Sequence, residues 1–134
     1  MLKLLLGLAL VTNLLIANDW VRKGATVIDK KNHLQWEDDA KTDELADIWK
    51  MANARCSGLH LAGFTDWRLP TKIELQRLAK SQTAKANFAK LGRYLYWSAD
   101  KDDSDAFVVY VPNGFASKSD TCDKNYALCV RDTK

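Results

Sequence analysis

Two short strand candidates, the second with alternating apolar and polar side chains, predict a β-hairpin early in the chain. They cover residues 25–28 and 33–36, and Leu34 and Trp36 share one face of the second segment. Between them, residues 29–32 (DKKN) have the composition of a turn. The pattern therefore indicates two antiparallel strands joined by this turn.

A second pattern, in which apolar residues recur at three- and four-residue spacing, predicts a helix from about Asp43 to Cys56. Asp43 and Glu44 would stabilise its positive N-terminus, and Arg55 would stabilise its negative C-terminus. The apolar stripe of this helix would consist of Leu45, Ile48, Trp49, Ala52 and Cys56.

The stretch around which the chain is organised is residues 63–75, GFTDWRLPTKIEL. Gly63 can adopt a positive φ, and Asp66 can bond its own backbone, so a tight turn is expected before Trp67. Pro70 forces the preceding residue out of the α region. It therefore ends the short extended piece that begins at Trp67.

A helix follows, because Thr71 and Glu74 match a capping box. The Thr71 hydroxyl would accept a hydrogen bond from the Glu74 amide, and the Glu74 carboxylate would accept one from the Thr71 amide. The helix would begin at about Lys72, with Ile73 at the edge of its buried face. That face would consist of Leu75, Leu78 and Ala79.

Residues 81–92 predict a loop with a short helix, and the rest of the chain has strand character. The strand candidates are residues 94–99 (YLYWSA), 106–111 (AFVVYV), 115–118 (FASK) and 126–132 (YALCVRD). Residues 100–105 (DKDDSD) would form an acidic loop, and Asn113-Gly114 is a strong hairpin signal. Helices in the first half and antiparallel strands in the second favour an α+β domain.

The first 17 residues have the layout of a secretory signal peptide, with Lys3 before an uncharged apolar run. Cleavage is expected after Ala17, although Leu15 is larger than the residue usual at that position. The alternative is an uncleaved membrane anchor, but the run is shorter than the roughly 20 residues of a spanning helix. We expect an exported protein, periplasmic or extracellular, with one domain over residues 18–134.

The charge of the chain argues against one class of function, and its cysteine content predicts a disulfide. Removing Lys3 leaves 19 basic and 17 acidic residues, a net charge of +2, with the two signs interspersed. This is not the pattern of a nucleic-acid-binding protein. Three cysteines in an exported chain suggest one disulfide and one spare thiol. One pairing would join Cys122 to Cys129 across a small loop.

The order of motifs resembles the Lcl C-terminal domain family. The resemblance is carried by TVIDKKNHLQW, a helix ending in cysteine, LAGFTDWRLPTKIEL, YWSA, the Asn-Gly hairpin and CVRD. It implies an α+β, C-type-lectin-like fold related to that of the sulfatase-modifying factors, with two helices packed on a small twisted antiparallel sheet with long loops. It also implies an exported or surface bacterial protein. Some members of the family are implicated in adhesion and in binding sulfated polysaccharides, and many have no assigned activity.

The resemblance further places the end of the first helix against the final strand, which implies a disulfide between Cys56 and Cys129. Such a bond would close a loop of about 73 residues, for which chain entropy gives roughly 4 kcal/mol of stabilisation. Cys122 would then be a free thiol, available for an intermolecular link.

Aromatic residues in the motifs are expected to serve the core. Trp36, Trp67 and Trp97 can each bury a large apolar area while the indole N–H finds a carbonyl. One of them, or Trp20, could instead stack on a sugar, and Trp49 has the weakest claim to a site.

Arg68, Glu74 and Arg131 are expected to form a partly buried ion-pair cluster that joins the central stretch to the last strand. The resemblance marks these three as motif residues, together with Pro70 and Thr71. Arg68 is also a candidate for binding a sulfate or carboxylate.

The spacing of the carboxylate and histidine residues does not favour a metal site or a catalytic site. The carboxylates of residues 100–105 raise the question of calcium, but they lack EF-hand spacing and its glycine. His33 and His60 show neither zinc nor triad spacing. We therefore expect no metal, no cofactor and no enzyme, and the sequence does not match the cysteine pair of the formylglycine-generating enzymes.

The leading interpretation is a non-catalytic lectin-like module that binds a glycan, a polyanion or a protein through loops between Tyr94 and Asn125. The candidate ligand-binding residues are Lys101, Asp103, Lys118 and Lys124. The alternative is a small envelope component that docks on a protein partner, with Cys122 as a covalent link. A membrane would be contacted only through an uncleaved N-terminal segment.

Overall fold

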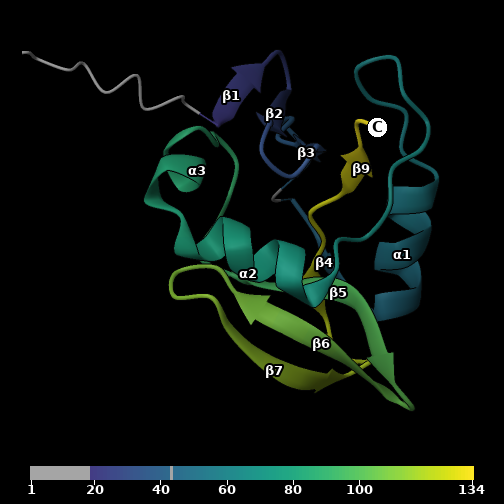
Figure 1. The fold of residues 1–134 in the computed structure, drawn as a ribbon. Coiled ribbons are helices and arrows are strands. Elements are labelled where there is room, and N and C mark those ends of the chain that lie inside the picture. Colours follow the sequence, from purple (N-terminus) through teal and green to yellow (C-terminus); the bar gives the residue numbers. More distant parts are fainter. Residues whose placement is uncertain (1–18, 43) are drawn as a thin grey trace, which may run out of the picture.

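The computed structural model describes residues 19–42 and 44–134, so the expected signal peptide lies outside the described residues. These residues form two sheets and three helices (Figure 1). The helices are α1 (Trp49–Ser57), α2 (Lys72–Lys80) and α3 (Gln82–Ala86). The strands are β1 (Trp20–Lys23), β2 (Thr26–Asp29), β3 (Leu34–Glu37), β4 (Ala46–Asp47), β5 (Leu95–Asp102), β6 (Asp105–Tyr110), β7 (Phe115–Asp120), β8 (Asn125–Tyr126) and β9 (Val130–Asp132). Within this part of the chain, no helix combines the length and the apolar character needed to cross a membrane.

The first sheet contains the predicted hairpin. Its strand order is β1-β2-β3-β9, with every neighbouring pair antiparallel. Val27 of β2 lies opposite Trp36 of β3, and both are fully buried. Trp36 in turn lies opposite Val130 of β9. The sheet thus joins the start of the described chain to its end, through pairings with β1 and β9 that the local pattern does not predict.

Helix α1 begins at Trp49, later than predicted. Residues 46–47 instead form β4, which pairs with β8. The Asp47 carboxylate accepts a hydrogen bond from the Ile48 amide, and Ile48 is extended at φ −65° and ψ 157°. Leu45 is 72% exposed, so its placement on a buried helix face was wrong. Pairing with a distant strand overrides the helical periodicity at this position.

The central stretch folds as predicted. Gly63 has φ +82°. The Thr71 hydroxyl accepts from the Glu74 amide at 3.1 Å, and the Glu74 carboxylate accepts from the Thr71 amide at 2.8 Å. Helix α2 therefore begins at Lys72, and its buried residues are Leu75, Leu78 and Ala79. The short helix expected within residues 81–92 is α3.

The second sheet has the order β4-β8-β5-β6-β7, and β5 runs parallel to β8. The predicted Asn-Gly hairpin joins β6 to β7, with Tyr110 opposite Phe115 and Gly114 at φ +76°. Helix α2 lies along one face of β5, β6 and β7, and α1 stands beside the same sheet (Figure 1). This arrangement gives the α+β architecture with two principal helices.

Two predictions for this half were wrong. Residues 100–105 are not an open loop, because β5 runs to Asp102 and β6 begins at Asp105, which leaves a tight turn with Asp103 at φ 54°. Residues 126–132 are not one strand, because they divide between β8 in the second sheet and β9 in the first. A buried apolar run carries no local signal that tells which sheet each part joins.

Two buried clusters hold the elements together. One gathers residues of the first sheet, α2, β5 and β6, among them Val27, Trp36, Leu75, Leu78 and Tyr96. The other lies between α1 and the second sheet and includes Cys56, Trp67, Leu69, Trp97 and Val108.

Candidate functional site

Arg68 fastens the central stretch to the last strand. Its guanidinium donates to both carboxylate oxygens of Glu74, at 2.8 and 3.0 Å, and to Asp132 at 3.1 Å. A further bond of 3.3 Å reaches the Leu69 carbonyl. These bonds occupy all five N–H groups of the side chain, so Arg68 has none left for a ligand.

The ion pair shifts both pKa values in the direction of the charged forms. The hydrogen bond to Glu74 raises the pKa of Arg68. Burial opposes the ionisation of Glu74, but bonds from Arg68 and Thr71 outweigh it, and the pKa of Glu74 is lowered. This pair is therefore a charged structural link at neutral pH.

Arg131 forms a separate link and pairs with Asp66 instead of Glu74. Its guanidinium donates to Asp66 at 2.7 Å and to Gln35 at 2.8 Å, and it lies 3.5 Å from the centre of the Phe64 ring. The hydrogen bond from Arg131 lowers the pKa of Asp66. The single cluster expected from the sequence is thus two clusters, both of which tie the central stretch to β9.

The motif tryptophans lie in the core. The buried tryptophans are Trp20, Trp36, Trp67 and Trp97. The Trp97 indole donates to the Asp47 carbonyl at 2.8 Å, and Trp67 donates to the Phe64 carbonyl at 3.1 Å. The Trp36 indole N–H has no hydrogen-bond partner among the described residues. None of these four side chains is placed to stack on a sugar at the surface.

Cys56 and Cys129 form a disulfide with an S–S distance of 2.04 Å, and both residues are fully buried. Cys122 is a free, exposed thiol. The bridge joins the end of α1 to the segment that precedes β9, which is the geometry that the resemblance implies.

The sequence-based ligand candidates do not converge. Lys101 lies opposite Ala106, while Lys118 lies opposite Phe107. Because neighbouring residues of a strand point to opposite faces of a sheet, these two lysines lie on different faces. Lys101 also sits 4.8 Å from the centre of the Trp49 ring.

The other candidates lie at the same end of the second sheet. Lys118 is paired with Asp102, whose hydrogen bond raises the pKa of Lys118. Asp103 occupies the β5–β6 turn, and Lys124 is exposed in the connection between β7 and β8. Residues 94–125 are mostly strand, so the loops through which a ligand was expected to bind are short turns.

No group of three or more histidine, cysteine, aspartate or glutamate side chains within the described residues could hold a metal ion. Asp100, one of the calcium candidates, accepts a hydrogen bond from the Lys72 amide at 2.9 Å. That carboxylate therefore serves the N-terminus of α2.

A basic segment, residues 77–93, is a feature that the sequence reasoning above missed. Its cations are Arg77, Lys80, Lys85, Lys90 and Arg93, and no acidic residue occurs between Glu74 and Asp100. Within residues 19–42 and 44–134, none of the five cations has an ion-pair partner. The signal was available as a local charge count, which the nearly balanced total charge conceals.

Two hollows, each ≈ 370 Å³, flank the β6–β7 turn beside the basic segment. One is lined by Lys80, Asn113 and the 69% exposed Phe115, with others. The other is lined by Lys85 and Arg93, with others. Cations, an amide and an exposed aromatic ring therefore lie around a single turn.

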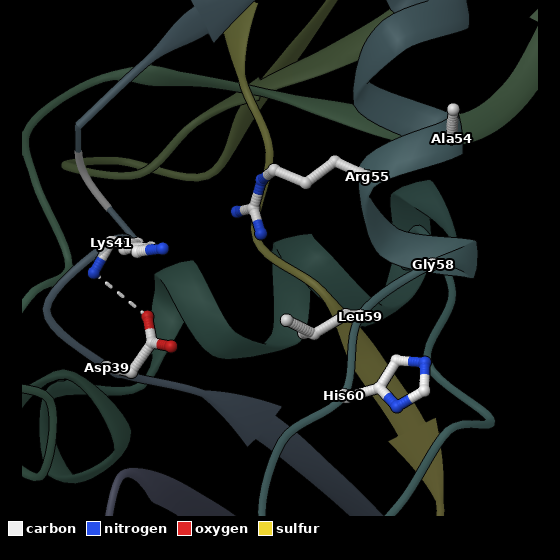
Figure 2. Close-up of a pocket in the computed structure, with 7 residues that line it drawn as sticks. All are labelled: Asp39, Lys41, Ala54, Arg55, Gly58, Leu59 and His60. Carbon is white, nitrogen blue, oxygen red and sulfur yellow. Dashed lines mark hydrogen bonds between the residues drawn. The ribbon is translucent and has the colours of Figure 1, made fainter.

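A third hollow, the Arg55 groove, has a volume of ≈ 490 Å³ and lies between α1 and the segment after β3. Figure 2 shows the Arg55 side chain extending from α1 across this groove, with Asp39 and Lys41 on the opposite wall and Leu59 and His60 below. Lys41 and His60 are exposed to solvent. The groove lies apart from the basic segment, none of whose cations lines it.

A buried carboxylate fixes Arg55 in this groove. Glu37 is fully buried and accepts from the two terminal nitrogens of Arg55 at 3.1 and 2.6 Å. It also accepts from the Cys129 amide at 2.8 Å, while Arg55 donates to the Ala127 carbonyl at 2.9 Å. Burial raises the pKa of Glu37, although the bonds from Arg55 and Cys129 act in the opposite direction.

Comparison with solved structures supports the lectin-like architecture. The crystal structure of botrocetin, a C-type-lectin-like protein, matches with a TM-score of 0.50 at 9% sequence identity. The match covers 85% of this chain and 96% of botrocetin. At this identity the likeness concerns the fold alone, and the fold is C-type-lectin-like.

Sequence comparison finds a fimbrial tip subunit and a domain family. The chain is 39% identical over 72 residues to the Major fimbrium tip subunit FimD of Porphyromonas gingivalis, a match covering 52% of this chain. The match spans 10% of the length of these relatives. The family model of the Lcl C-terminal domain matches residues 25–131, and this chain therefore belongs to the Lcl C-terminal domain family.

Proposed function

We propose that this protein is an exported, non-catalytic adhesion module that binds an acidic polysaccharide along its basic segment. The observation that carries the proposal is the set of five cations in residues 77–93, none of which has an ion-pair partner in the described part of the chain. Uncompensated cations raise the local potential, attract polyanions and accelerate their association.

The surroundings of the basic segment suit a saccharide. Lys80 and Lys85 flank the β6–β7 turn, since a Cβ on Gly114 would meet the Lys80 side chain and the Lys85 ammonium lies 3.5 Å from the Pro112 carbonyl. Phe115 offers an exposed ring beside this turn. Sulfate or carboxylate groups would contact the cations, and a sugar face would contact the ring.

Three observations favour export and a role at the cell surface. The Cys56–Cys129 disulfide is stable in an oxidising compartment. The similarity to a fimbrial tip subunit favours an adhesive role. The apolar pattern of residues 1–17 favours a cleaved signal peptide. N-terminal mass spectrometry of the native protein tests this last point, since an intact Met1 would contradict it.

Heparin-affinity chromatography with matched charge variants tests the proposal. One variant replaces three lysines of the basic segment with glutamine, namely Lys80, Lys85 and Lys90. The matched control replaces the three lysines favoured by the sequence, Lys101, Lys118 and Lys124. Both variants lose the same formal charge, so a difference between them reports location.

The basic-segment variant should elute at clearly lower salt than the parent protein, because exposed charges act through a screened field that salt weakens. The matched control should elute close to the parent. Equal losses in both variants would indicate a response to net charge alone, and a larger loss in the control would move the site to the other end of the sheet. Either result would refute the proposal.

A further inference from the structure

Arg55 lines two hollows, and both lie apart from the basic segment. One is the Arg55 groove, and the other is a small cavity of ≈ 50 Å³ that Arg55 lines together with Leu45 and Met51. Neither hollow is lined by any cation of the basic segment. The Arg55 side chain therefore lies between a groove with polar walls and a cavity with mainly apolar walls.

The guanidinium is held in one orientation and keeps unused donors. A guanidinium has five N–H groups, and Arg55 makes three hydrogen bonds, two to Glu37 and one to the Ala127 carbonyl. Its Nε–H and one Nη1–H have no partner in the described part of the chain. The side chain is 33% exposed and lines the groove. A carboxylate is the acceptor that a planar guanidinium binds best.

The small cavity forms a socket in which four apolar side chains are joined by Asp47, Asn125 and Arg55. Its floor includes the buried Ala52 and Ala127, and its rim includes Leu45 and Met51, which are 72% and 51% exposed. Leu45 and Met51 therefore expose neighbouring apolar surface beside this cavity, and contiguous exposed apolar surface marks sites of protein interaction. The socket is small enough to select a single aliphatic side chain.

The acidic groups near Arg55 do not occupy its free donors. The Asp39 carboxylate accepts from the Lys41 amide at 3.0 Å and from the Thr42 hydroxyl at 3.2 Å. The Asp47 carboxylate accepts from the Ile48 amide at 2.8 Å. Each of these two carboxylates is tied to its own loop, so among the described residues no carboxylate other than Glu37 accepts a hydrogen bond from Arg55.

We propose that Arg55 and the socket formed by Leu45 and Met51 dock an acidic peptide segment of a partner protein. A leucine-sized side chain fills the socket, and the carboxylate of the next residue accepts from Arg55. A uronic acid or a sulfated sugar offers the anion without the aliphatic group, which is why the occupant is a peptide. This site is independent of the basic segment, so the failure of one proposal leaves the other standing.

Titration of the ¹⁵N-labelled full chain with three synthetic peptides tests the proposal. The probe is an acetylated, amidated Gly-Ser-Leu-Glu-Ser-Gly, and its controls carry glutamine in place of glutamate or alanine in place of leucine. The probe should shift the amide resonances of Leu45, Met51, Arg55 and their neighbours. Each control should bind at least about fivefold more weakly, as expected for the loss of one partly buried aliphatic group or one charged hydrogen bond.

Two protein variants test the socket while leaving the Glu37–Arg55 ion pair intact. Leu45→Ser should weaken the probe about fivefold, whereas Ile73→Ser, at a 55% exposed position of α2, should leave it unchanged. Absence of shifts at millimolar probe, equal affinity for the glutamine control, or unaltered binding to Leu45→Ser would overturn the proposal. The same shifts produced by sodium glucuronate would assign the site to acidic sugars and would overturn it as well.

Discussion

Replacing Arg55 with methionine gives the sharpest stability prediction. Methionine is about as long as the aliphatic part of arginine, so it fills the same path without offering a donor. Glu37, which is fully buried, would lose both bonds from Arg55 and keep one bond, from the Cys129 amide. Leaving a buried charge without its partner costs about 3–5 kcal/mol. Since small domains have about 5–15 kcal/mol of total stability, Arg55→Met should be markedly destabilised at neutral pH.

The loss should depend on pH in a defined direction. Burial already raises the pKa of Glu37 above its ordinary value of 4.5, and Arg55 opposes that rise. Without Arg55 the pKa of Glu37 in the folded state rises further, so the folded protein binds the proton more tightly than the unfolded one. Its contribution to stability is then fully present below 4.5 and is lost as pH rises through the folded-state pKa. The variant should therefore regain stability, relative to the parent, as the pH falls from neutral.

Urea unfolding followed by tryptophan fluorescence measures this effect at several pH values. The double variant Glu37→Gln/Arg55→Met removes the stranded charge and should recover part of the stability at neutral pH. A loss below about 1 kcal/mol for Arg55→Met would place the pair in the class of weak surface ion pairs. That result, or a loss that does not change with pH, would refute the reasoning.

Three further predictions concern the scaffold. Replacing Cys56 and Cys129 together with alanine should lower the free energy of unfolding by roughly 4 kcal/mol, since the bridge spans 73 residues, and urea unfolding against the parent protein checks it. Because the pKa of Glu74 is lowered, its contribution to the free energy of unfolding is present above pH 4.5, its ordinary pKa, and is lost as the pH falls through the folded-state pKa. A Glu74→Gln variant should therefore lose less stability than the parent protein when the same urea series is repeated at acidic pH. Trp36→Phe should cost less than Trp97→Phe in thermal unfolding, because the Trp36 indole N–H has no partner while Trp97→Phe strands a carbonyl; the opposite order would contradict this account.

The parts of the fold that the sequence predicts are those specified by neighbouring residues. The capping box of α2 needs only Thr71 and Glu74, and the β6–β7 turn needs only Asn113 and Gly114, so each is readable locally. The start of α1 is not, because β4 depends on pairing with β8 near the other end of the chain.

The site shows the same division. The basic segment is a local property and could be found by counting charges over residues 77–93. The Arg55 groove could not, because Glu37 and Arg55 come from a strand and a helix, and their pairing follows from how β3 and α1 pack around the disulfide. Lys101 and Lys118 show the opposite error. They lie in the same sheet and were expected to form one site, but their side chains lie on different faces of the sheet.

The most direct test of polysaccharide binding is a lysine-acetylation footprint of the full chain with and without heparin, quantified by mass spectrometry for each lysine. The account predicts that Lys80, Lys85 and Lys90 lose reactivity when heparin is bound, while Lys31 and Lys101 keep it. Protection of Lys101 with full reactivity of Lys80 and Lys85 would contradict the account.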